Sequence, residues 1–177
     1  HHVYLEGYEL PTMNVGPTSP VVSPDGGQVA FSARGWIWVL DVQTGRATRI
    51  TDGAEMDFRP ARSHDGSQLA FVRDDSRDTW IVVRNLETAE ERVINTPAID
   101  LDPVFGPDGG IIYASSSAGR FDLWIDDGTA LTEGRPFELK PSLSRDGNVL
   151  VHLQKGGGLD RVLAVNSRSG LTTELLV

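Results

Sequence analysis

The chain contains no cysteine and no apolar run long enough to span a bilayer. The lack of cysteine excludes disulfides, a thiol nucleophile, and zinc or iron–sulfur sites held by cysteines. A membrane-spanning helix needs about 18 consecutive apolar residues, so we expect no membrane insertion. Acidic residues number 25 against 16 basic ones, for a formal net charge of −9. Because such a surface repels phosphate backbones, we expect no nucleic-acid partner.

Signatures of catalysis are also missing from the sequence. No G-x-S-x-G nucleophile elbow and no H-E-x-x-H zinc motif occurs,. Beyond the first two residues the histidines are His64 and His152. We expect His64 to be exposed in a hairpin turn, and His152 to be structural or to face a rim of the channel. The glycine run 156–158 lacks the Lys-Ser/Thr of a phosphate-binding loop,. An acidic loop contains Asp74, Asp75 and Asp78 but lacks the spacing of an EF-hand, so we expect its side chains to be solvated,. We therefore expect no catalytic residue and no resident cofactor.

A seven-residue pattern, P-x-x-[SG]-x-D-G, recurs four times along the chain. It begins at Pro20, Pro60, Pro103 and Pro141, and its Asp-Gly pairs lie 40, 43 and 38 residues apart. Repeats of this length are typical of proteins built from stacked supersecondary units. An Asp-Gly pair between apolar runs indicates a hairpin, because glycine supplies the positive φ of a tight turn.

Each pattern is followed by short β-rich runs and no sustained helical period, which predicts four strands in about 40 residues. In the third repeat the last strand is expected at 129–132, close behind the turn at 126–128. Repeated four-stranded antiparallel units are typical of propeller blades around a central channel. The sequence thus predicts an all-β β-propeller with four blades. The tryptophans should pack between blades: Trp36, Trp38, Trp80 and Trp124.

The first repeat resembles the repeats of TolB-like β-propellers in its Ser23-Pro-Asp-Gly26 turn, its Ala30-Phe31 strand, its run from Ile37 to Asp41 and its Arg49-Ile-Thr51 strand. The resemblance extends over roughly residues 17–177. It implies blades at about 17–56, 57–99, 100–137 and 138–177, after an N-terminal extension, 1–16. Such repeats are found in TolB scaffolds and in propellers attached to amidohydrolases or prolyl-oligopeptidase-like peptidases.

Four blades are few for this family, and three explanations remain open. The chain is a piece of a longer protein, or two chains form a homodimer that completes a larger ring, or four blades close alone. An open array would leave apolar faces bare, with Val29, Phe31, Ile37 and Val39 at one end. At the other end the exposed residues would be Leu150, Leu163 and Val165. The segment 3–10 is either an extra strand or a linker.

Charged residues precede the proline in three repeats, as Asp57-Phe-Arg59, Asp100-Leu-Asp102 and Glu138-Leu-Lys140. Strand alternation should place the apolar middle residue on one side and both charged residues on the other. We expect these six to surround one mouth of the channel, which the four acids make acidic and the two basic residues partly balance. A basic peptide or another ligand should bind there. A cation such as calcium is one alternative, and ordinary solvated loop charges are another.

The sequence therefore favours a non-catalytic module that binds a protein or small-molecule partner at its channel mouth. The alternative is the propeller portion of a larger amidohydrolase or serine peptidase whose catalytic domain lies elsewhere. The TolB resemblance further implies a periplasmic or extracellular location.

Overall fold

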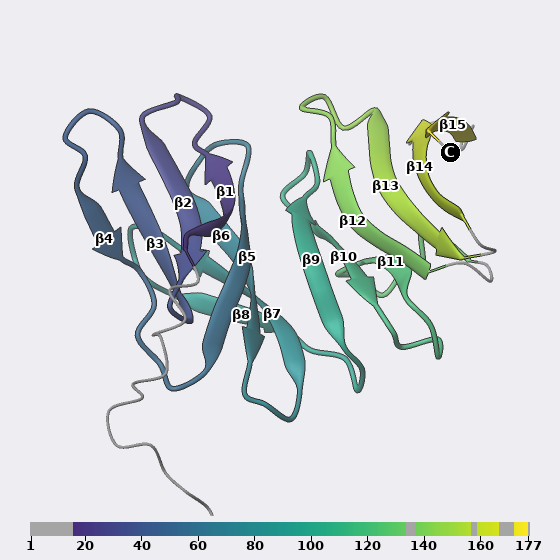
Figure 1. Ribbon diagram of the computed structural model, residues 1–177, viewed down its shortest axis with the longest axis horizontal. Helices are drawn as coiled ribbons and strands as arrows, with labels where there is room; N and C mark the ends of the chain where they lie inside the picture. Colours follow the sequence, from purple (N-terminus) through teal and green to yellow (C-terminus); the bar gives the residue numbers. More distant parts are fainter. Residues whose placement is uncertain (1–15, 134–136, 157–158, 167–171, 177) are drawn as a thin grey trace, which may run out of the picture.

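The computed structural model describes residues 16–133, 137–156, 159–166 and 172–176, so the expectation for the N-terminal segment 3–10 lies outside it. The described residues form four antiparallel sheets that follow one another along the chain (Figure 1). They contain no helix that is long and apolar enough to cross a membrane. The all-β propeller architecture predicted from the repeats is confirmed.

Each sheet is one blade, with its strands in chain order from the inside outwards. Blade 1 contains β1 (Thr18–Val22), β2 (Gln28–Ala33), β3 (Trp36–Asp41) and β4 (Ala47–Arg49). Blade 2 contains β5 (Met56–Arg62), β6 (Gln68–Asp74), β7 (Thr79–Asn85) and β8 (Glu91–Ile94). Blade 3 contains β9 (Asp100–Phe105), β10 (Ile111–Ser115) and β11 (Asp122–Ile125). Blade 4 contains β12 (Phe137–Leu143), β13 (Val149–Gly156), β14 (Leu159–Asn166) and β15 (Thr172–Leu176).

Blade 3 differs from the expectation, because its predicted last strand at 129–132 is not a strand. A single bridge joins Ala130 to Trp124, and the Leu131 amide donates to the Leu123 carbonyl. The turn before it is very short, since the Gly128 amide donates back to Ile125. So tight a return leaves room for one bridge only, and the blade has three strands.

The repeated pattern builds the hairpin between the first two strands of each blade. In blade 2, Ser63 donates its hydroxyl to Asp65, and Asp65 in turn accepts the backbone amide of Ser67. Gly66 has a φ of 77°, the left-handed conformation that this turn requires,. Blades 1 and 4 repeat the serine–aspartate contact, whereas blade 3 has Gly106 in place of the serine.

This turn predicts a pH effect at Asp65. Hydrogen bonds from Ser63 and Ser67 lower the pKa of Asp65 to about 2, from an ordinary value of 3.8. A carboxylate whose pKa falls on folding stabilises the protein above its unfolded pKa, and that contribution is lost as the pH falls through the folded pKa. We therefore expect Asp65→Asn to lower the melting temperature at pH 6 but to have almost no effect at pH 2. A thermal melt series across this range measures it, and an equal effect at both pH values would contradict it.

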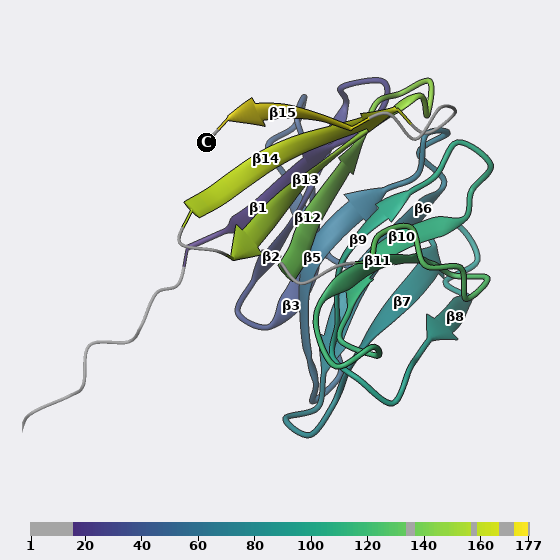
Figure 2. The ribbon, with the colours of Figure 1, turned by 90° about the vertical axis from the view of Figure 1, so that its right-hand side faces the viewer.

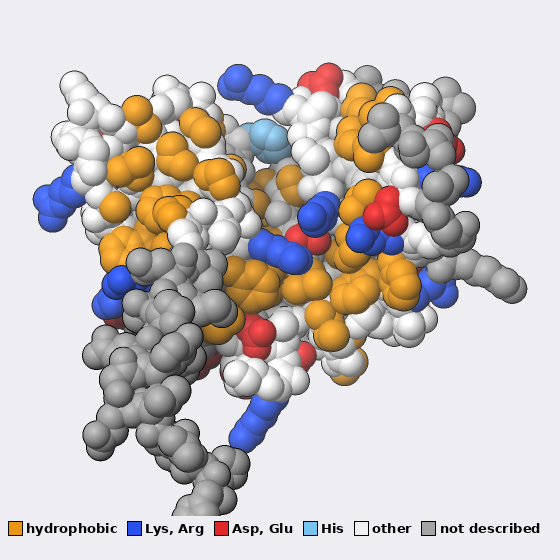
Figure 3. Space-filling model, viewed as in Figure 1, with side chains coloured by type: hydrophobic (Ala, Val, Ile, Leu, Met, Phe, Trp, Pro, Cys, Tyr) orange, Lys and Arg blue, Asp and Glu red, His pale blue; other side chains and the backbone are white. Residues whose placement is uncertain are grey.

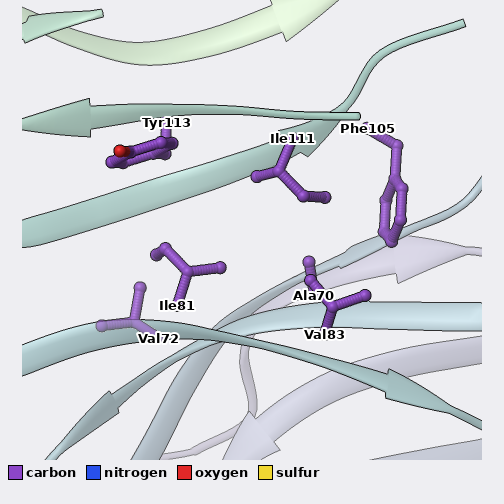
Figure 4. Close-up of a cluster of buried hydrophobic side chains, with 7 residues drawn as sticks. All are labelled: Ala70, Val72, Ile81, Val83, Phe105, Ile111 and Tyr113. Carbon is purple, nitrogen blue, oxygen red and sulfur yellow. The ribbon is translucent and has the colours of Figure 1, made fainter. Parts of the chain in front are cut away.

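Apolar side chains fill the two seams around blade 2. The seam to blade 1 holds Ile37, Leu69, Phe71 and Val82. The seam to blade 3 joins side chains of both sheets (Figure 4): Ala70, Val72, Ile81, Val83, Phe105, Ile111 and Tyr113. These side chains are less than one-tenth exposed, so the sheets are locked face to face,.

Two of the four tryptophans pack as expected. Trp80 lies against the seam between blades 1 and 2, and Trp124 lies against the next seam. Trp36 does not pack between blades but stacks under the Arg49 guanidinium and donates its Nε1 proton to the Gly53 carbonyl. Its partners belong to its own blade and the chain that leaves it.

The four blades form an open arc. Blades 1 and 4 lie at opposite ends of the molecule (Figure 1), and no described strand of one contacts a strand of the other. Figure 2 shows the outer strands β8 and β15 on opposite sides of the arc. Among the described residues, the blades therefore do not close a ring by themselves.

The bare faces are only partly those predicted. In blade 1, Phe31 pairs with Trp38 and Val29 with Leu40, and all four are partly exposed. Ile37 and Val39 are buried against blade 2 instead, because neighbouring strand residues point to opposite faces,.

The expectation for the blade 4 end was also wrong. Leu150 is 5% exposed and packs with Ala114 and Leu123 of blade 3. Leu163 and Val165 pair with His152 and Leu150, so they share this inward face,. No described blade covers the opposite face, which carries residues such as Val151 and Val162, both partly exposed.

Candidate functional site

Every innermost strand bends at the residue before its proline. Ser19, Arg59, Asp102 and Lys140 have φ values of 51°, 54°, 54° and 52°, in the left-handed region that residues other than glycine rarely adopt,. The strand register shifts at the same place in all four blades. Such bulges change the direction in which a side chain points. Each residue held in this region destabilises the folded state by about 1–3 kcal/mol. The fold therefore accepts strain in every blade to place these four residues.

These four residues, with three of the prolines behind them, line a hollow of about 440 Å³ in the centre of the arc. The hollow is polar and open, with contributions from all four blades. In Figure 3, charged side chains lie over the middle of the molecule, between apolar side chains on blades 1 and 4.

Asp102 is the only acid among the described residues that line this hollow, and two other lining residues contact its carboxylate. Arg59 Nη1 lies 2.7 Å from its Oδ1, and the Lys140 amide donates to its Oδ2 over 3.2 Å. The Lys140 ammonium makes no ion pair with any described residue. Two cations face one anion, so the hollow carries one positive charge in excess.

The other three predicted site residues lie elsewhere, inside their own blades. Asp57 is 1% exposed and accepts two hydrogen bonds from Arg73, with Nε to Oδ1 at 2.8 Å and Nη2 to Oδ2 at 3.1 Å. This pairing raises the pKa of Arg73 and keeps its charge fixed. Asp57 serves as a buried brace between β5 and β6.

Asp100 and Glu138 occupy the same repeat position as Asp57 and are also buried. Thr96 donates its amide and hydroxyl to the Asp100 carboxylate, and burial raises the pKa of Asp100. Glu138 accepts a hydrogen bond from Gln154, and its Oε2 lies 2.5 Å from His152 Nδ1. His152 is 2% exposed and takes the place that aromatic residues hold in the other blades, which agrees with a structural role.

The sequence thus grouped six residues that the structure divides into two sets. Alternation predicted that both charged residues of each pair would share one side. The bulge breaks that alternation, so Arg59, Asp102 and Lys140 line the hollow while Asp57, Asp100 and Glu138 are buried. The expected acidic mouth is therefore basic on balance. The described residues contain no cluster of three His, Asp or Glu side chains suited to a metal, so the geometry gives the calcium alternative no support.

Sequence reasoning missed Ser19 and the apolar residues at the starts of the inner strands. Ser19 has no charge, but it stands directly before Pro20 as Arg59 stands before Pro60, which was a usable signal. The residue before each buried acid is also large and apolar: Met56, Ile99 and Phe137.

Two curated proteins have sequences similar to this chain. An uncharacterised peptidase, YuxL, of Bacillus subtilis is 29% identical over 93% of this chain, which spans 26% of the peptidase. A TolB homologue of Chlorobium luteolum is 25% identical over 72% of this chain, which spans 30% of that protein. This chain therefore spans less than a third of either relative.

Among solved structures, TolB from Acinetobacter baumannii superposes with a TM-score of 0.79 at 21% identity. The match covers 91% of this chain and 43% of that one, and at this identity it shows the shared fold. The TolB beta propeller domain family matches residues 14–176, nearly the whole chain. The protein belongs to the TolB beta propeller domain family.

Proposed function

We propose that this chain is a non-catalytic binding module whose central hollow takes an anionic ligand or an acidic segment of a protein partner. The carrying observation is the charge excess of the hollow, where Arg59 and Lys140 face Asp102 alone. A propeller-type arrangement brings backbone and side chains of several blades to one point, which suits recognition without chemistry. The location that fits the TolB resemblance is the periplasm or the cell exterior.

The free ammonium of Lys140 offers the sharpest test. Charge-assisted hydrogen bonds are worth about 1.5–3 kcal/mol, so Lys140→Ala should weaken binding of a tri-glutamate peptide roughly 10-fold or more. Isothermal titration calorimetry in low salt measures the affinity.

Lys155→Ala is the matched control, since it removes the same charge from blade 4. Lys155 forms an exposed pair with Asp160, at 3.3 Å, and is not among the residues that line the hollow. Its loss should leave the affinity within about twofold. Equal losses in the two variants would mean that the peptide responds to overall charge and not to this hollow.

A second function is favoured by one observation, the similarity to the peptidase YuxL over 93% of this chain. In that case the propeller would dock or filter peptides for a hydrolase domain elsewhere in the polypeptide. A native reading frame that continues into such a domain would favour this second function.

A further inference from the structure

The starts of the inner strands carry an apolar rim beside the basic hollow. Met56, Ile99 and Phe137 hold the same position in blades 2, 3 and 4, one residue before the buried acid. They are 55%, 48% and 48% exposed, among the most exposed large apolar residues described. Single exposed apolar residues are ordinary, but three at one repeat position lie at one end of the inner strands and so around one mouth.

Neighbouring turns fix two of these side chains in place. Met56 lies over Gly35, in the turn between β2 and β3, where an added Cβ would stand 3.6 Å from the Met56 Cγ. Phe137 meets Phe121, in the equivalent turn of blade 3, with ring centroids 6.4 Å apart. Each side chain thus covers the seam to the preceding blade on one side and offers its other side to solvent.

The rim and the charged residues have a constant separation. Met56, Ile99 and Phe137 each precede Arg59, Asp102 and Lys140 by three residues along one strand. At about 3.3 Å per residue, three residues of strand span at most about 10 Å, so an apolar and a charged residue lie within that distance of each other along each strand. An extended segment with the complementary pattern could contact both.

We propose that the partner of this surface is an extended peptide segment that carries a large aliphatic or aromatic side chain about three residues from a carboxylate. The apolar side chain lies on the rim, and the carboxylate reaches Lys140 and Arg59. This inference rests on the proposed function, because it adds a second contact to the same anion-binding hollow.

Three fluorescein-labelled octapeptides test the proposal with this chain. One repeats Leu-Ser-Ser-Glu, one repeats Ser-Ser-Ser-Glu with the same charge, and one repeats Leu-Ser-Ser-Lys. Fluorescence anisotropy should show the leucine–glutamate peptide binding about tenfold tighter than the serine–glutamate peptide, since burying one leucine contributes that much or more. The lysine peptide should not bind.

A triple rim variant, Met56→Ser with Ile99→Ser and Phe137→Ser, should reduce the advantage of leucine to about twofold or less. Its affinity for the serine–glutamate peptide should stay unchanged. The matched control replaces three equally exposed apolar residues on the outside of the blades: Val42→Ser, Val93→Ser and Leu175→Ser. Circular dichroism and thermal melts confirm that both triple variants fold.

Each contrary outcome has a separate meaning. If neither acidic peptide binds, the proposed function fails and this inference fails with it. If both acidic peptides bind equally, or if the control variant loses the leucine preference as well, the hollow binds anions but the rim is no contact surface. Tight binding of the lysine peptide would overturn the charge complementarity.

Discussion

Replacing Phe71 by alanine is expected to lower the free energy of unfolding by about 3–5 kcal/mol. Phe71 is fully buried in the seam between blades 1 and 2, beside Leu69 and Val82. Removing a buried phenylalanine loses its transfer free energy and leaves a cavity that the flanking sheets cannot close. Urea denaturation, with the midpoint and slope fitted together, measures the change.

Phe31→Ala is its natural control, because Phe31 holds the same position in the repeat. In both blades, the second residue after the repeated proline pairs with a residue of the next strand. The phenylalanine lies two positions after that partner. No described blade covers Phe31, which is already partly exposed, so its loss should cost about 1 kcal/mol,. The difference between the two variants measures whether a neighbour covers blade 1.

Equal costs for the two variants would contradict an open arc in solution. They would mean that another surface buries Phe31, such as a second copy of the chain. A homodimer that completes a larger ring is the association proposed from the repeat count, and light scattering across concentrations would show its doubled mass. If the two variants lose different amounts of unfolding free energy and the mass is that of a monomer, this face of blade 1 is exposed in solution.

Asp57→Ala is expected to lower the free energy of unfolding by about 3 kcal/mol while leaving peptide binding unchanged. The substitution removes both hydrogen bonds that Arg73 donates and leaves that guanidinium largely buried beside Glu91. Breaking a buried pair from one side costs about 3–5 kcal/mol, and the contact with Glu91 keeps this case at the low end. Denaturation and anisotropy on the same preparation separate stability from binding.

The exposed pair of Lys155 and Asp160 is the comparison for this effect. Both side chains are about half exposed, so Asp160→Ala should change the free energy of unfolding by no more than about 1 kcal/mol,. A loss of peptide affinity in Asp57→Ala, measured well below its melting temperature, would include Asp57 in the proposed binding surface. It would then contradict the division of the six charged residues into two sets.

The blades themselves could be predicted because their information is local. An Asp-Gly pair with a serine two residues earlier builds its own turn from side-chain and backbone hydrogen bonds within six residues. The apolar runs after it pair with the next run along the chain, so strand order follows sequence order. The missing fourth strand of blade 3 was the exception, because the sequence of the short turn did not show that the chain after it would form only one bridge.

The composition of the charged hollow could not be predicted in the same way. Arg59 reaches the hollow and Asp57 does not, because Arg59, directly before Pro60, has a left-handed backbone conformation. Strict alternation would place both side chains on the same side of the strand. Likewise, the exposure of Phe31 and the burial of Phe71 depend on whether a neighbouring blade is present. Identical positions in a repeat therefore differ by several kcal/mol in their expected contribution.

Sequence alone determined the repeat, the turn chemistry, the all-β blades and the absence of catalytic signatures, because each depends on residues close together in the chain. Tertiary structure alone decided that three acids are buried braces, that the hollow is basic on balance, and that an apolar rim stands beside it. These properties arise where strands from different blades meet. They depend on strand bulges and on packing between residues far apart in the sequence, which a local sequence pattern does not show.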